Sequence, residues 1–266
     1  MLENPRRPAV AGMFYPAQEK VLRALIGEMM AQAPEVAPEP VAMVAPHAGY
    51  IYSGLTAAYA YKTLEKSTTP RRVILVGPSH RVALQGVSVG NFTSFLTPLG
   101  AVPVDQVIVE DLCREPDVTA NPTAHIQEHS LEVHLPFLQV ALGNFTLVPI
   151  VYGQIRPSRL AELISICWHP RDLLVFSSDL SHYHPYLHAR ELDSQVHRAV
   201  LSLDSKAALG CEACGGIGIS AILDISRRRG WRSMLADYRN SGDTAGDKAK
   251  VVGYASYLFH SADAES

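Results

Sequence analysis

The chain has 266 residues, of which 47% are hydrophobic, and its formal net charge is −3. This composition supports one sizeable α/β core, and the small charge gives no electrostatic reason to expect nucleic acid or an anionic membrane as a partner. Four cysteines in a chain of this length do not suggest a disulfide scaffold. No apolar stretch approaches the ~20 residues that span a bilayer, and the N-terminus lacks a signal-peptide layout. We therefore expect a cytoplasmic protein.

Periodic apolar residues and β-rich runs alternate along the first half of the chain. They predict, in chain order, a helix over residues 17–33, a Pro-rich linker over 34–40, a strand over 41–46, a helix over 55–64, a strand over 72–77, a short strand or hairpin over 86–95 and a helix over 104–114. The two longer strand runs are continuously apolar, which is typical of strands buried on both faces of a parallel sheet.

The second half continues the same alternation. It predicts a helix over residues 130–142 that starts late or kinks at Pro136, a strand over 145–152, a helix over 158–168, a strand over 172–177, helices over 189–203 and 215–229, and strands over 233–238 and 251–259. Alternation of this kind over residues 1–266 predicts a single three-layer α/β/α domain with a mostly parallel central sheet.

Chemically active side chains follow three of the predicted strands. His47 comes after the first, His80 after the second, and Asp179 and His182 after the strand over residues 172–177. Because ligands of open α/β sheets bind at the carboxyl ends of the strands, these side chains should meet at one edge. Two imidazoles and a carboxylate form a metal-binding set. A metal site is the leading hypothesis, and ordinary loop histidines are the structural alternative.

Cys211 and Cys214 form a C-x-x-C pattern just before the predicted helix over residues 215–229. The pattern is typical of a redox pair or of half a zinc site, but the chain has no second C-x-x-C. A helix N-terminus favours a thiolate, which is a good ligand for iron, copper or zinc. A small buried cysteine beside a glycine turn is an interpretation of equal weight.

Residues 125–129, HIQEH, match the inverted zinc-protease pattern H-x-x-E-H. That mechanism needs both histidines on one face of a continuous helix. Asn-Pro-Thr stands just upstream, which predicts that His125 precedes the helix and argues against a protease. Glu128, His129, Glu132 and His134 are still candidates to line the pocket or to orient its ligands, and a polar helix start is the alternative.

A local histidine cluster is formed by His182, His184 and His188. Only His182 follows the strand end closely enough for proton transfer there, and we expect the other two at the surface. The basic residues 227–232 close a predicted helix, where cations complement the helix dipole, so we interpret them as a solvated helix end.

Five segments of the chain resemble the Memo family, which is called AmmeMemoRadiSam system protein B in prokaryotes. They are RPAVAGMFYP at residues 7–16, PHAGYIYSG at 46–54, GPSH at 77–80, EHSLEVHLP at 128–136 and SSDLSH at 177–182. Because the motifs are spread along the chain, the resemblance covers essentially its whole length.

The Memo family is similar in fold to the LigB-type class III extradiol dioxygenases, which use non-haem iron. This resemblance implies a LigB-like fold, with His47 and His80 as paired metal ligands and His182 as the catalytic histidine. Cys214 falls where those enzymes place a carboxylate ligand, and Asp179 lies beside the same pocket. A thiolate in place of a carboxylate gives a softer site, which argues against ordinary ring cleavage.

Together, the residues and the resemblance lead to one hypothesis and two alternatives. The hypothesis is a mononuclear redox protein that holds Fe(II), or else Cu or Zn, on His47, His80 and Cys214. His182 would be its general acid/base, and Asp179 a further ligand or base. The alternatives are a non-catalytic module that binds a peptide or phosphate group, and a zinc-dependent hydrolase. The resemblance also implies a radical-SAM protein as partner, while the small-molecule or peptide substrate stays unassigned.

Overall fold

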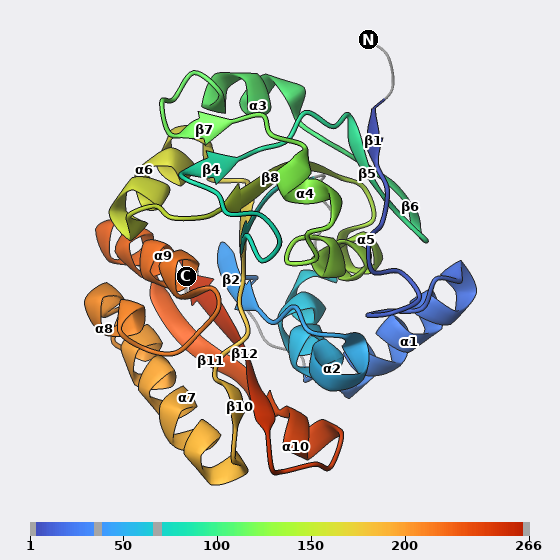
Figure 1. The fold of residues 1–266 in the computed structure, drawn as a ribbon, viewed down its shortest axis with the longest axis vertical. Coiled ribbons are helices and arrows are strands. Elements are labelled where there is room, and N and C mark those ends of the chain that lie inside the picture. Colours follow the sequence, from blue (N-terminus) through green and yellow to red (C-terminus); the bar gives the residue numbers. More distant parts are fainter. Residues whose placement is uncertain (1–3, 35–38, 66–70, 263–266) are drawn as a thin grey trace.

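The computed structural model describes residues 4–34, 39–65 and 71–262, and a nine-stranded sheet runs through its centre (Figure 1). In order across the sheet, the strands are β10 (His182–His184), β12 (Val251–His260), β2 (Ala42–Ala45), β9 (Leu173–Ser177), β3 (Arg71–Pro78), β8 (Phe145–Tyr152), β4 (Val87–Ser88) and β7 (Val118–Thr119), while β11 (Arg232–Asn240) pairs with β12. The four central strands β2, β9, β3 and β8 are parallel and almost wholly buried, which explains their continuous apolar sequences.

Antiparallel strands flank this parallel centre. β12 runs antiparallel to β2 and carries β10 and β11 as further antiparallel partners, and β4 runs antiparallel to β8. The predicted α/β class with a mostly parallel sheet is confirmed.

A second, three-stranded sheet consists of β1 (Pro5–Arg6), β5 (Ser94–Thr97) and β6 (Gly100–Pro103). Residues 86–95, predicted as a short strand or hairpin, contain the short strand β4 and the start of β5. The hairpin alternative is wrong, because β4 joins the large sheet and β5 joins the small one. Gly90 lies between them with a φ of 63°, a left-handed conformation that glycine adopts without steric cost. The chain therefore passes from the large sheet to the small one between these two strands.

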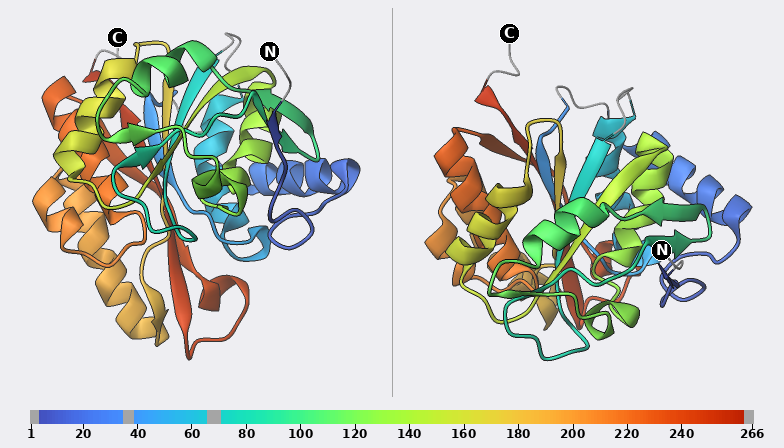
Figure 2. Two further views of the ribbon diagram at one scale, coloured as in Figure 1. Left: turned by 45° about the horizontal axis from the view of Figure 1, so that its top comes forward. Right: turned by 90° about the horizontal axis from the view of Figure 1, so that it is seen from above.

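Helices cover both faces of the large sheet and complete the three layers (Figures 1 and 2). One face carries α1 (Glu19–Gln32), α2 (Tyr50–Tyr61) and α5 (Leu135–Leu142), and the other carries α6 (Pro157–Cys167), α7 (Tyr186–Leu201), α8 (Ser205–Leu209) and α9 (Gly216–Arg229). Short elements connect these: η1 (Lys62–Leu64), α3 (Gln106–Leu112), α4 (Thr123–Ile126), η2 (Glu132–His134) and α10 (Ser241–Thr244). None of the helices in the described ranges has both the length and the apolarity to cross a membrane.

One helix begins earlier than the sequence predicts, and another begins late, as predicted. α2 begins at Tyr50 rather than at residue 55, because the Gly49 carbonyl already accepts the N–H groups of Tyr52 and Ser53 at 2.8 and 3.1 Å. α5 has Pro136 in its first turn, where a missing N–H costs nothing, so the predicted late start is confirmed. The middle of the predicted linker, residues 35–38, lies outside the described residues.

Glycine allows α9 to approach the end of β9 closely. A Cβ atom at Gly215 would stand 2.5 Å from the Ser177 carbonyl oxygen and 2.4 Å from the Ser178 Cβ, which is closer than non-bonded atoms can come. The preceding residue, Cys214, is thereby held against the carboxyl end of β9.

The carboxyl ends of β2, β9 and β3 lie side by side. Ala45 at the end of β2 pairs with Ser177 at the end of β9, and Phe176 of β9 pairs with Val76 of β3. The chain segments that follow these three ends therefore share one edge of the sheet, where the sequence predicts the site.

Candidate metal centre

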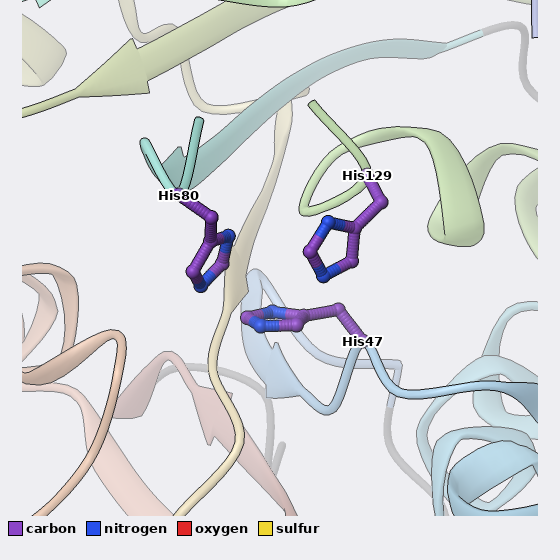
Figure 3. A group of neighbouring side chains, drawn as sticks. All are labelled: His47, His80 and His129. Atoms are coloured by element: carbon purple, nitrogen blue, oxygen red, sulfur yellow. The ribbon is translucent and has the colours of Figure 1, made fainter. Parts of the chain in front are cut away.

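Three histidine side chains converge at this edge of the sheet: His47, His80 and His129 (Figure 3). One ligand nitrogen from each ring lies within 4.8 Å of those from the other two. Among the described residues, this is the group of three metal-ligating side chains that one ion could contact. The sequence predicts His47 and His80 here, whereas it suggests His129 only as a residue of the pocket wall.

A hydrogen-bond network fixes which nitrogen of His47 is available to a ligand. Ser177 Oγ donates to the Ser130 carbonyl oxygen at 2.5 Å. The same Oγ therefore accepts hydrogens from His47 Nδ1 at 2.6 Å and His134 Nε2 at 2.8 Å, while His134 Nδ1 accepts from the Tyr61 hydroxyl. The proton of His47 is thus on Nδ1, and its Nε2 has a free lone pair. Burial holds the pKa of His47 well below 6.5, so the ring is neutral, as a metal ligand must be.

Glu128 orients His80 in the same way. Its Oε1 lies 2.9 Å from His80 Nδ1, and its Oε2 accepts the His80 backbone N–H at 2.5 Å. The backbone N–H groups of His129 and Ser130 also donate to Oε1. Although burial alone would raise it, these hydrogen bonds lower the pKa of Glu128 to about 2. Because an ionised carboxylate only accepts, Nδ1 of His80 carries the proton and Nε2 is free to bind a metal.

His129 packs against the other two rings but lacks such an orienting partner. Its ring stacks on His80 at 4.8 Å between centroids and meets His47 edge-on at 5.5 Å, and Phe14 lies 5.0 Å away. Its Nδ1 stands 3.4 Å from Glu128 Oε1 and, within the part of the chain that is described, has no hydrogen-bond partner. Burial lowers the pKa of His129 to about 4, so this ring is neutral as well.

Cys214 approaches the same nitrogen of His47 from the start of α9. Its Sγ lies 3.3 Å from His47 Nε2 and accepts the Asp179 backbone N–H at 3.2 Å. Burial, and then the charge of Asp179, raise the pKa of this thiol, so it is protonated unless a cation displaces the proton. Cys211 is also a free thiol, but it donates to the Ala207 carbonyl oxygen instead.

Asp179 and His182 line a cavity of about 710 Å³ together with the three histidines. Asp179 Oδ1 accepts the His47 backbone N–H at 2.8 Å, and Oδ2 lies 4.0 Å from His47 Nε2. Burial raises the pKa of Asp179 to about 7, which suits a group that exchanges protons near neutral pH. His182 is half-buried, and burial lowers its pKa as well.

Apolar side chains surround the mouth of this cavity. Met13, Ile51 and Tyr183 line it and are 73%, 71% and 70% exposed. Isolated exposed apolar residues need no explanation, but three at one cavity mouth form a surface that a bound molecule could cover. Lys250 and Asp247 add one charge of each sign to the lining.

The H-x-x-E-H pattern does not form a protease site. His125 lies in the short helix α4, which ends at Ile126, so it precedes the later helix α5 as predicted and shares no continuous helix with His129. His125 Nε2 instead lies 3.1 Å from the Ser88 carbonyl oxygen, away from the cluster. Of the surface candidates, His184 has its Nε2 2.9 Å from Glu212 Oε2, and His188 is exposed.

Glu132 binds the N-terminal segment through an ion pair and several hydrogen bonds and so fixes it beside the site. It is fully buried, forms an ion pair with the buried Arg6, and accepts hydrogen bonds from Ala9 N at 2.7 Å, Val10 N at 3.0 Å and the Tyr15 hydroxyl at 2.6 Å. The segment held in this way continues into the cavity wall, where its next residues lie beside the cluster.

Known proteins are similar in sequence to this chain over nearly its whole length. A family model described as "Memo-like protein" matches residues 6–258. The chain belongs to the Memo family. A MEMO1 family protein of Archaeoglobus fulgidus is 38% identical over 268 residues, covering 96% of this chain and 99% of the relative. "MEMO1 family protein Ta0237" of Thermoplasma acidophilum is 34% identical over 263 residues, covering 95% and 98% of the two chains.

One solved structure resembles this Memo-family chain in fold. It is the crystal structure of uncharacterized protein JW3007 from Escherichia coli K12, with a TM-score of 0.52 and 13% identity. The match covers 82% of this chain and 98% of that one. At this identity the likeness concerns the fold alone.

The role of Ser177 in this Memo-family site leads to a first prediction. Replacing Ser177 by alanine removes the acceptor that keeps the proton of His47 on Nδ1, so we expect metal affinity to fall about 10- to 100-fold. Ser165→Ala is the matched control, because the Ser165 hydroxyl donates to the Ala161 carbonyl oxygen of its own helix, α6. Competition with a chromophoric chelator measures both, and equal affinities would show that Ser177 does not orient a ligand.

Proposed function

We propose that this Memo-family chain is a mononuclear metal-dependent oxidoreductase that holds Fe(II) on His47, His80 and Cys214. The observation that supports this most is the orientation of the two imidazoles. A separate hydrogen-bond partner binds Nδ1 of each ring, which leaves Nε2 of each ring for a ligand beside one cavity. Metal-binding histidines in proteins have this kind of support almost without exception.

The same rule favours Cys214 over His129 as the third ligand. Nδ1 of His129 lacks a hydrogen-bond partner within the described ranges, so nothing fixes its tautomer. The Sγ of Cys214 lies outside the close group of three histidines, but the Asp179 backbone N–H fixes it 3.3 Å from His47 Nε2. A cation there would displace the thiol proton and supply a thiolate ligand, which iron, copper and zinc all accept.

The metal, when bound, would supply a redox-active Lewis acid at the base of the cavity. The protein's own groups would then move protons and position the substrate. His182 would act as general acid/base from the cavity wall, and Asp179, with a pKa of about 7, would accept or return a second proton. His129 would face the substrate as a neutral imidazole that stacks on His80.

One observation favours a zinc-dependent hydrolase as the second candidate. The closely spaced group in the structure consists of three histidines, and three imidazoles are a known ligand set for catalytic zinc. In that case His129, not Cys214, would complete the site. The radical-SAM partner stays a prediction of the family resemblance.

The test is anaerobic loading of the metal-free protein with Fe(II) alone. We expect a single iron per chain in the wild type, and a loss of affinity on the order of 100-fold or more in His47→Ala and in His80→Ala, because each removes a ligand outright. His188→Ala is the control, since its side chain is 53% exposed and should leave iron binding unchanged. Thermal unfolding verifies that each variant is folded.

The outcomes separate the candidates. Iron retained by both His47→Ala and His80→Ala would contradict the proposal. Zinc with turnover of an ester or amide substrate would favour the hydrolase. A wild-type protein that takes up no metal under anaerobic conditions would favour a non-catalytic binding module.

A further inference from the structure

The segment that carries His182 has an unusual backbone. β10 pairs with β12 through His182 opposite Val252 and His184 opposite Val251, with a register shift between them. Tyr183 is the extra residue of this bulge, and its φ of 62° is rare for a residue with a side chain. Bulges of this kind redirect side chains next to active sites, and they persist only where surrounding contacts hold them.

A single turn, residues 211–214, contacts this segment at two points. At one end, Cys214 N donates to the Asp179 carbonyl oxygen at 3.2 Å, and Asp179 N donates to Cys214 Sγ at the same distance. At the other end, Glu212 Oε1 accepts the His182 backbone N–H at 2.9 Å. The spacing of the C-x-x-C motif therefore lets one turn hold both residues that face the cavity.

Glu212 contacts both His182 and His184, the residues on either side of Tyr183 in the bulge. Its Oε2 lies 2.9 Å from Nε2 of His184, so one carboxylate spans both sides of Tyr183. The residues before the bulge have their own contacts: Leu180 N donates to the Gly253 carbonyl oxygen, and Ser181 N donates to Asp193 Oδ1. The residues of the bulge itself are held by pairing with β12 and by Glu212. Because side chains alternate along a strand, a slip of one residue would turn His182 away from the cavity.

We propose that Glu212 is a positioning residue, which holds the His182–His184 bulge so that His182 faces the cavity beside His47 and His80. The C-x-x-C motif then holds this segment in place, and its second residue, Glu212, positions His182, so the motif does not serve as a redox pair. The effect on metal chemistry rests on the proposed function, whereas the effect on the direction of His182 does not.

Three variants test this: Glu212→Ala, Glu212→Gln and, as control, Glu191→Ala, because Glu191 is an exposed glutamate of α7. In Glu212→Gln the amide oxygen can take the place of Oε1, which accepts the His182 N–H and also lies 3.1 Å from His184 Nε2. The first readout is diethyl pyrocarbonate modification of His182 in the metal-free protein, mapped by mass spectrometry against the exposed His169. We expect the rate of His182 modification to rise about fivefold or more in Glu212→Ala. The loss of one hydrogen bond shifts the population of side-chain orientations by about this factor. Glu212→Gln and the control should stay within about twofold of wild type.

The second readout is azide affinity of the cobalt-loaded protein, with His182→Ala as the reference. Glu212→Ala should weaken azide binding by a factor similar to that of His182→Ala, with cobalt affinity unchanged, and Glu212→Gln should restore it. The proposal would be overturned if His182 were modified in Glu212→Ala at the wild-type rate. It would also be overturned if Glu212→Gln matched Glu212→Ala in modification rate and azide affinity. If the wild type binds no metal, the proposed function fails and the labelling experiment alone decides the role of Glu212.

Discussion

Replacing Glu132 by alanine is expected to lower the free energy of unfolding by about 3–5 kcal/mol, which is the typical cost of removing one partner of a buried ion pair. Arg6 is 2% exposed and would keep its buried charge without a carboxylate partner. The N–H groups of Ala9 and Val10 and the hydroxyl of Tyr15 would lose their acceptor as well. Chemical denaturation at neutral pH measures this loss.

Two comparisons sharpen this prediction. Glu162→Ala removes a half-exposed glutamate that pairs with Arg159 at 3.4 Å, so it should cost less than about 1 kcal/mol. Removing both buried charges, as in Arg6→Met with Glu132→Leu, should recover part of the stability lost in Glu132→Ala. A Glu132→Ala protein as stable as the Glu162→Ala control would contradict the proposed anchoring of the N-terminal segment.

Replacing Cys214 by serine is expected to reduce Fe(II) affinity by about 100-fold or more, beyond the 10- to 100-fold typical of residues that only orient a ligand. His129→Gln should reduce it by less than about tenfold, because no hydrogen-bond partner among the described residues holds that ring in one tautomer. Chelator competition gives both affinities. Cobalt loading adds a spectroscopic readout, since a thiolate ligand gives a charge-transfer band that should vanish in Cys214→Ser and persist in His129→Gln.

Cys211→Ser is the matched control for this experiment. In the wild type, the Cys211 thiol donates to the Ala207 carbonyl oxygen and not to the histidine cluster. The Fe(II) affinity and the cobalt spectrum of Cys211→Ser should therefore match those of the wild type. The reverse ranking, with His129→Gln losing the metal and Cys214→Ser keeping it, would replace the thiolate site by a three-histidine site and favour the hydrolase.

The parts of the site that follow strands could be predicted from the sequence. His47, His80 and Asp179 come just after apolar runs long enough to identify β2, β3 and β9, and parallel strands bring such residues to one edge. The glycines after Cys214 signalled the start of α9, although not how closely it packs on β9.

Other parts have no local signal in the sequence. His129 lies in an irregular stretch between α4 and η2, so no periodicity places its side chain against the other two rings. Glu132 meets Arg6 across 126 positions of sequence, and a single charged residue does not reveal a partner so distant. The bulge at Tyr183 occupies a strand of three residues, which is too short for an alternating pattern to show.

The most direct test of the metal site is an anomalous difference map at the iron edge, from crystals of protein loaded anaerobically with Fe(II). We predict a single peak within bonding distance of Nε2 of His47 and of His80, on the side that Cys214 Sγ faces. No peak at this edge of the sheet, or iron held instead by the surface residues His184 and His188, would contradict the site proposed for this Memo-family chain.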